Sequence, residues 1–95
     1  MGGTGISTIF CINSITPMKY IYPSTLSTNV SVIGNNQYGC ELFIYNDKST
    51  SVTVGFVKGS ASGSPESSKD HSLGPKKMLH AILVNSSIGW YIQDM

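Results

Sequence analysis

The chain is a succession of short runs of apolar and β-branched residues, separated by polar turns rich in Ser, Thr, Asn and Gly. Alternation with a period of two predicts strands, and no stretch shows the 3.6-residue period of an amphipathic helix. The runs lie at 6–12, 18–22, 29–33, 40–45, 51–57, 76–84 and 88–92. About seven short strands predict a single all-β domain over residues 1–95, either a small antiparallel β-sandwich or a jelly-roll-like barrel.

The strongest predicted strand is 40–45, because alternate residues on both of its faces are apolar or aromatic. A strand covered on both faces is expected to be central in its sheet. The polar run Asn46–Thr50 is predicted to be a hairpin turn, which would pair this strand with the next one, 51–57.

The last two runs flank a polar turn and predict a C-terminal hairpin that carries the only tryptophan, Trp90. Ile88 and Ile92 lie at alternate positions on either side of it, so all three are predicted to share a face that is buried in the core or between subunits. The alternative is that Trp90, Tyr91 and Tyr22 form an exposed platform on which a sugar stacks.

Two segments lack strand character. Residues 1–8 are rich in glycine and are predicted to be an N-terminal arm that becomes ordered on a neighbouring protein. Residues 58–74 form a run rich in Ser, Gly and Pro that is predicted to be a long exposed loop.

Charge excludes some partners. Only 12% of the residues are charged and the formal net charge is +1, so there is no basic patch to favour nucleic acid. No window approaches about 18 apolar residues, and no basic segment precedes an apolar one at the N-terminus. We therefore expect neither a nucleic-acid nor a membrane partner, and synthesis in the cytoplasm.

Catalytic motifs are weak. Asp70-His71-Ser72 holds the three residue types of a catalytic triad consecutively, but adjacent side chains diverge and cannot form the relay. Gly34–Gly39 has the glycine spacing of a phosphate loop, but Cys40-Glu41 follows where that loop requires Lys and then Ser or Thr. No catalytic residue is predicted.

Four residues are possible metal ligands: Cys11, Cys40, His71 and His80. No pair of them has the short spacing of a zinc site, so no metal site and no cofactor are predicted. Cys11 and Cys40 lie in apolar runs and are expected to be buried free thiols, with a disulfide and a reactive thiol as alternatives. His80 is expected to be a structural histidine with a hydrogen-bond partner.

From Tyr20 to the C-terminus, the order of features resembles small β-rich modules of tailed-bacteriophage structural proteins. The shared features are a strand ending in Tyr22-Pro23, the segment Gly39–Asn46, a return strand Val52–Val54, a variable loop and a Gly89-Trp90-Tyr91-Ile92 ending. Such modules occur in head-decoration proteins, head fibres and tail-fibre tips, and they commonly assemble as trimers.

The resemblance implies a non-enzymatic virion structural protein, a capsid decoration (cement) or minor head protein that binds the capsid surface as an oligomer. Its expected partners are the major capsid protein or another virion protein and further copies of itself, as a trimer, because exposed strand faces with Phe43, Tyr45 and Tyr91 need cover. A length of 95 residues favours this class over a fibre tip. The alternative is a tail-fibre or receptor- or carbohydrate-binding module, and an enzyme comes third.

Overall fold

A computed structural model describes residues 8–59 and 68–95, and in this part of the chain every regular element is a strand. The eight strands found there are β1 (Thr8–Phe10), β2 (Met18–Tyr22), β3 (Val30–Ile33), β4 (Glu41–Asn46), β5 (Val52–Val57), β6 (Ser68–Leu73), β7 (Met78–Asn85) and β8 (Gly89–Asp94). The all-β prediction is therefore confirmed.

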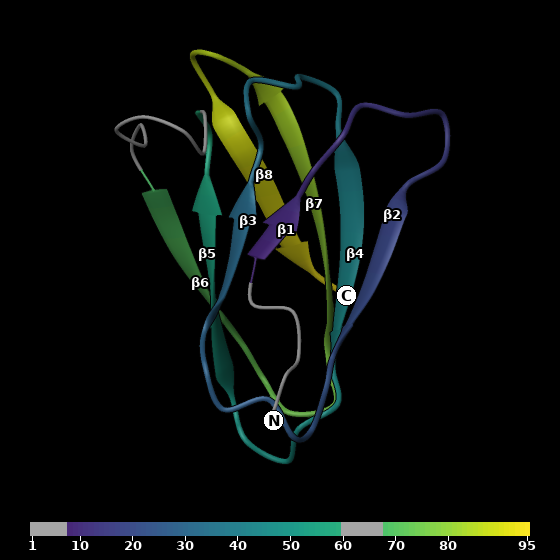
Figure 1. Cartoon of the computed structure of the whole chain (residues 1–95), viewed down its shortest axis with the longest axis vertical. Helices are drawn as coiled ribbons and strands as arrows, with labels where there is room; N and C mark the ends of the chain where they lie inside the picture. Colours follow the sequence, from purple (N-terminus) through teal and green to yellow (C-terminus); the bar gives the residue numbers. More distant parts are fainter. Residues whose placement is uncertain (1–7, 60–67) are drawn as a thin grey trace.

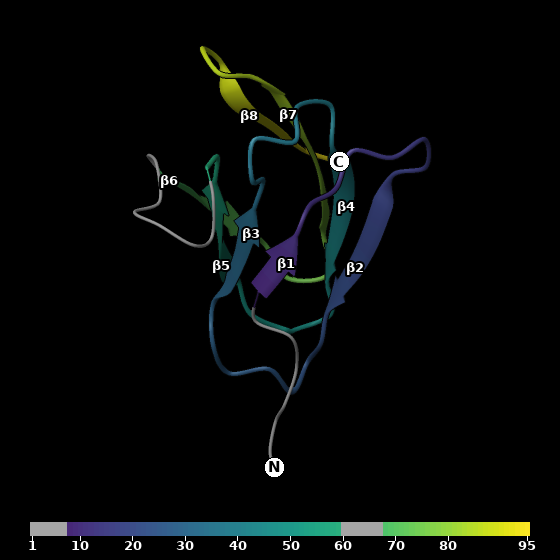
Figure 2. The same ribbon diagram turned by 45° about the horizontal axis from the view of Figure 1, so that its top comes forward.

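The strands form two four-stranded sheets packed face to face, in the orders β1-β3-β5-β6 and β2-β4-β7-β8 (Figure 1). Strands β1 and β2 lie on one side of this sandwich, and β6 and β8 lie on the other (Figure 2). The predicted sandwich is confirmed, although its sheets are mixed. The β1–β3, β3–β5 and β2–β4 pairs are parallel, and the other pairs are antiparallel.

The parallel pairs arise because the chain changes sheet after each of its first four strands. Strands β1, β3 and β5 therefore run in the same direction in one sheet, and β2 and β4 run in the same direction in the other. This corrects one prediction: 46–50 is not a hairpin turn, because β4 and β5 belong to different sheets. The expected central position of β4, between β2 and β7, and the C-terminal β7–β8 hairpin are both confirmed.

The core lies between the sheets and is built from the inward-facing alternate residues of the strands. Its largest fully buried side chains are Phe56, Leu42, Ile44, Leu73, Leu79 and Leu83. Trp90 of β8 is 5% exposed, its indole Nε1 donates to the Val57 carbonyl at 3.2 Å, and its ring lies 5.1 Å from that of Phe56. The prediction that Trp90 is buried is confirmed. Ile88, in contrast, precedes β8 and is exposed.

The predicted loop at 58–74 contains a strand, since β6 pairs with β5 in antiparallel register from Ser68 to Leu73. Sequence patterning missed it because Leu73 is its only apolar residue. A strand at the edge of a sheet can remain polar on its solvent side. The predicted arm at 1–8 falls outside the described residues except for Thr8, which begins β1 and so corrects that boundary.

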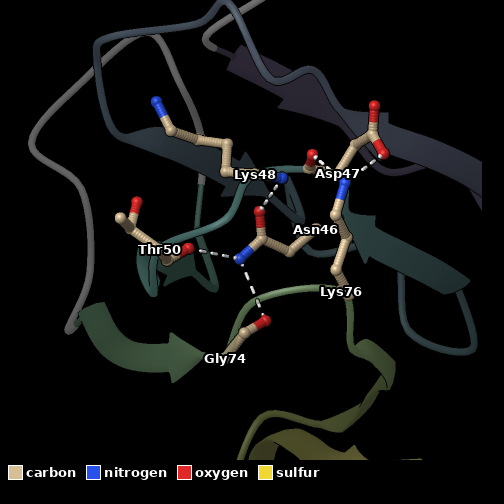
Figure 3. A network of polar contacts seen from close by, with 6 residues as sticks. All are labelled: Asn46, Asp47, Lys48, Thr50, Gly74 and Lys76. Atoms are coloured by element: carbon tan, nitrogen blue, oxygen red, sulfur yellow. Dashed lines mark hydrogen bonds and ion pairs between the residues drawn. The ribbon is translucent and has the colours of Figure 1, made fainter.

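Asn46, at the end of β4, is the one buried polar residue among the described residues of the core. Its side chain makes hydrogen bonds to loops at one end of the sandwich (Figure 3). Its side-chain Nδ2 donates to the carbonyls of Thr50 at 2.9 Å and Gly74 at 2.9 Å, and its Oδ1 accepts from the Lys48 N–H at 2.9 Å. The side chain therefore joins the turn after β4 to the connection between β6 and β7.

Candidate functional site

The surface that stands out on this protein is the solvent-facing side of the β2-β4-β7-β8 sheet, which we call the outer face. Its side chains alternate with the buried ones along each strand. Outside the β-bulge between Leu83 and Asn85, they are Lys19, Ile21, Glu41, Phe43, Tyr45, Met78, His80, Ile82, Tyr91 and Gln93. Six of these ten are apolar or aromatic, and Ile21 and Tyr91 are 63% and 52% exposed.

A groove of about 820 Å³ lies over β2 and β4 on this face. It is lined by Lys19, Tyr20, Ile21, Phe43, Tyr45 and Met78. The parallel register of β2 on β4 sets Lys19 beside Phe43 and Ile21 beside Tyr45, so one cation lies in an otherwise apolar and aromatic lining. Ligand sites commonly have this size and this composition. Within residues 8–59 and 68–95, the Lys19 side chain has no hydrogen-bond or ion-pair partner.

His80 and Glu41 form a hydrogen-bonded pair next to the groove. His80 Nε2 lies 2.5 Å from Glu41 Oε2, and the His80 ring stacks on Phe43 with centroids 4.6 Å apart. The expected hydrogen-bonded His80 is confirmed. Covalent catalysis by such a dyad would need a hydroxyl or thiol nucleophile in reach of the imidazole. The outer-face side chains next to His80 in the described strands are Ile82, Met78 and Gln93, which carry neither a hydroxyl nor a thiol.

The corresponding face of the other sheet has a different character. Its outward side chains are mostly small or polar, among them Ser31, Thr53, Asp70 and Ser72. Apolar side chains occur there in one row, formed by Phe10, Ile33 and Val57. The two faces of the sandwich are therefore not equivalent, and the larger apolar surface belongs to the outer face.

The segment Asp70-His71-Ser72 lies in β6, where consecutive side chains point to opposite sides. Asp70 Oδ1 lies over Gly55 on the solvent side, within 3.3 Å of where a Cβ on that glycine would be. His71 points inward instead, and its Nε2 is 2.6 Å from Asp94 Oδ1 on β8. The predicted divergence is confirmed, and His71 links the two sheets at the β6–β8 side.

The four possible metal ligands are distributed over separate places. Cys11 and Cys40 are buried free thiols in the core, which favours the first of the three alternatives drawn from the sequence. His71 and His80 pair with different carboxylates, Asp94 and Glu41. Within residues 8–59 and 68–95, no group of three His, Cys, Asp or Glu side chains is placed to hold a metal ion.

The Gly34–Gly39 loop uses its backbone amides within the protein. The N–H groups of Gly34, Asn35 and Asn36 donate to the carbonyls of Val57, Gly59 and Lys58 at 2.8–3.0 Å. Asn35, Asn36 and Gly39 have positive φ angles, as expected for a tight polar turn. Since three successive amides are already bonded to carbonyls, this loop cannot cradle a phosphate as a phosphate-binding loop does.

The sugar platform considered from the sequence is not assembled. Trp90 and Tyr22 are both buried in the core, where the Tyr22 hydroxyl donates to the Thr28 carbonyl at 2.5 Å. Tyr91 alone of the three faces solvent. The aromatic residues that do line a groove are Tyr20, Phe43 and Tyr45.

Comparison of the chain with protein-family models, with curated proteins and with solved structures finds no match. In the described ranges, no helix has the length and apolar character needed to cross a membrane.

Sequence patterning located part of this site. Phe43, Tyr45 and Tyr91 were predicted to need cover, and all three lie on the outer face. The pattern did not reveal the groove or the His80–Glu41 pair, because both depend on which strands are neighbours and in which register. A lysine and an isoleucine alternating in Met18–Tyr22 were the only local indication that β2 contributes to this surface.

Proposed function

We propose that this protein is a non-enzymatic structural protein of a virion, a capsid decoration or minor head protein that assembles through its outer face. The observation that carries this proposal is the apolar surface formed by Ile21, Phe43, Tyr45, Met78, Ile82 and Tyr91. Large contiguous apolar patches on soluble domains are typical of interaction surfaces.

The distribution of charge on the outer face supports a lasting interface. Glu41 already pairs with His80, so among the outer-face residues Lys19 is the one charged side chain with no partner in the described part of the chain. Interface cores are depleted in charged residues and enriched in aromatic residues and methionine. Burial of this face would stabilise an assembly mainly through the hydrophobic effect, which ionic strength weakens little.

Copies of this chain are the proposed occupants of the outer face, and a capsid protein is the proposed second partner. We propose a trimer because the phage modules that the sequence resembles from Tyr20 onward commonly assemble as trimers. In a cyclic trimer each interface is heterologous, so the β2 side of one copy contacts the β8 side of the next. The opposite, more polar sheet face and the loops then remain available for the capsid surface.

Particles provide the test of this proposal. Virus particles purified from cells that carry the gene should contain the protein in a fixed ratio to the major capsid protein. A cryo-EM reconstruction should place it on the head with the outer face covered. Ile21→Lys should abolish trimer formation and incorporation, whereas Thr53→Lys, on the opposite face, should leave trimer formation unchanged. Absence of the protein from the particles would contradict the proposal.

A second candidate, a tail-fibre or carbohydrate-binding module, is favoured by the groove over β2 and β4. Aromatic rings from Phe43 and Tyr45 could stack on the C–H faces of a sugar, and Lys19 could bind an acidic group. The two candidates differ in the effect of Lys19→Ala. This change should abolish glycan binding by a receptor-binding module, but it should leave a decoration protein on the capsid.

A further inference from the structure

The two cysteines come from opposite sheets and meet in the core. Cys11 directly follows β1, where its N–H donates to the Ile33 carbonyl at 2.9 Å. Cys40 directly precedes β4, where its carbonyl accepts from the Leu83 N–H at 3.0 Å. Their exposed fractions are 1% and 0%. The backbone on both sides of the thiol pair is therefore fixed by hydrogen bonds to the sheets.

Contacts next to the cysteines hold the two segments side by side. Two residues after Cys11, the Asn13 side chain donates from Nδ2 to the Tyr38 carbonyl, two residues before Cys40, at 2.7 Å. The same Nδ2 lies 3.2 Å from the position that a Cβ on Gly39 would occupy. Both views show the chain after β1 crossing from its own sheet towards β4 and β2 (Figures 1 and 2). The course of the chain after β1 and the Asn13–Tyr38 hydrogen bond therefore bring the segments that carry the two thiols close together.

The two thiols also perturb each other. The side-chain hydrogen bond with Cys40, together with burial, raises the pKa of Cys11. The hydrogen bond with Cys11 lowers the pKa of Cys40, and the Leu83 backbone N–H adds to this effect. Cys40 is thus the sulfur that more readily becomes a thiolate, the form that attacks disulfides.

We propose that Cys11 and Cys40 are a reversible modification site, which forms a disulfide between the two sheets when the protein meets an oxidising thiol–disulfide couple. With glutathione disulfide as the oxidant, the Cys40 thiolate attacks one glutathione sulfur and expels a glutathione thiolate. The Cys11 thiol then gives up its proton and attacks the Cys40 sulfur, which releases the second glutathione thiolate. Two protein thiols are oxidised, and one glutathione disulfide is reduced to two glutathione molecules.

The position of β1 gives the oxidant a route to these buried sulfurs. This strand has three residues, lies at the edge of its sheet and pairs only with β3 among the described strands. Short edge elements open locally with a smaller free energy than global unfolding. Oxidation should therefore occur in folded protein from which β1 has detached, and the disulfide should then prevent that detachment. The site does not depend on the proposed virion function.

The test is equilibration of the full chain with glutathione redox buffers, in native buffer and in concentrated urea. Remaining thiols are alkylated, and the products are counted by mass spectrometry. In native buffer we expect single chains that are lighter by two hydrogen atoms, with no covalent link to another chain. We also expect the effective concentration of the two thiols to be at least about tenfold higher than in urea, as is usual for a stabilising disulfide. The oxidised chain should accordingly unfold at a higher urea concentration than the reduced chain.

An effective concentration in native buffer that equals or falls below the value in urea would overturn the proposal. So would a product linked only between chains. The reduced wild-type chain is the main control, because it has the same sequence. Cys40→Ala serves as a second control, since oxidation should give it only a mixed disulfide with glutathione and no rise in the urea midpoint.

Discussion

The side-chain amide of Asn46 donates a hydrogen bond to the main-chain carbonyl of Gly74, 2.9 Å away and 28 residues along the chain. The same Nδ2 also donates to the Thr50 carbonyl and lies 3.2 Å from the Leu73 carbonyl. An amide fits this place because it can donate to several carbonyls while carrying no charge.

Asn46→Asp should destabilise the fold by about 3–5 kcal/mol at neutral pH, because a buried carboxylate would then face carbonyl oxygens in place of an NH₂ group. The loss relative to wild type should shrink at acid pH, where a protonated carboxyl can donate one hydrogen bond. Urea unfolding at several pH values measures this. Asp47→Asn is the control, since its side chain is 46% exposed and pairs only with Lys76 at the surface, so it should cost at most about 1 kcal/mol. Equal losses for the two variants would contradict the assigned role of Asn46.

Tyr22 should make the fold sensitive to alkaline pH. Its hydroxyl donates to the Thr28 carbonyl, and burial raises its pKa above the ordinary value of about 10. The unfolded chain therefore loses this proton first as the pH rises. The contribution of Tyr22 to stability is complete below about pH 10 and is lost as the pH increases through the raised pKa.

Tyr22→Phe should cost about 1 kcal/mol at neutral pH through the lost hydrogen bond. It should also remove the alkaline loss due to this residue, so the unfolding free energies of the two proteins should converge as the pH rises from about 9 to 11. Burial raises the pKa of Tyr20 as well, and this effect is common to both proteins. The charge of ionised Tyr22 raises the pKa of Tyr20 further, and Tyr22→Phe removes that second effect together with the Tyr22 hydroxyl. A difference that stays constant with pH would show that Tyr22 does not titrate with folding.

Trp90 and Tyr91 are neighbours in β8 whose side chains point to opposite sides of the sheet. Trp90→Ala should cost about 3–5 kcal/mol, because it removes a buried ring and its hydrogen bond to Val57. In a small domain this loss should prevent stable folding, as shown by circular dichroism. Tyr91→Ala is the matched control, and it should remain folded while assembling less well. Unfolding of both variants would mean that Tyr91 also stabilises the monomer.

Much of the fold followed from the period-two pattern, and the exceptions have physical causes. The pattern located the apolar strands and identified 40–45 as central, because burial dictates residue type at alternate positions. It could not reveal which strands pair, because a buried position in a strand requires an apolar side chain whether the neighbouring strand is parallel or antiparallel. It missed β6 because five of the six residues from Ser68 to Leu73 are polar.

Some residues of the candidate site could likewise be predicted from the sequence, and others could not. Phe43 and Tyr45 could be predicted as an exposed apolar pair, because their strand is apolar on both faces. Lys19 could not be placed beside them, because that depends on the parallel register of β2 on β4. The contact between Cys11 and Cys40 likewise depends on how the two sheets are stacked, which local sequence does not encode.

The most direct measurement of the central claim is the mass of the protein in solution by light scattering coupled to gel filtration. Wild-type protein at micromolar concentration should have the mass of three chains, and Ile21→Lys should shift it to the mass of one folded chain. Thr53→Lys, on the opposite sheet, should remain a trimer. A wild-type protein that is a stable monomer with its outer face exposed would contradict the account.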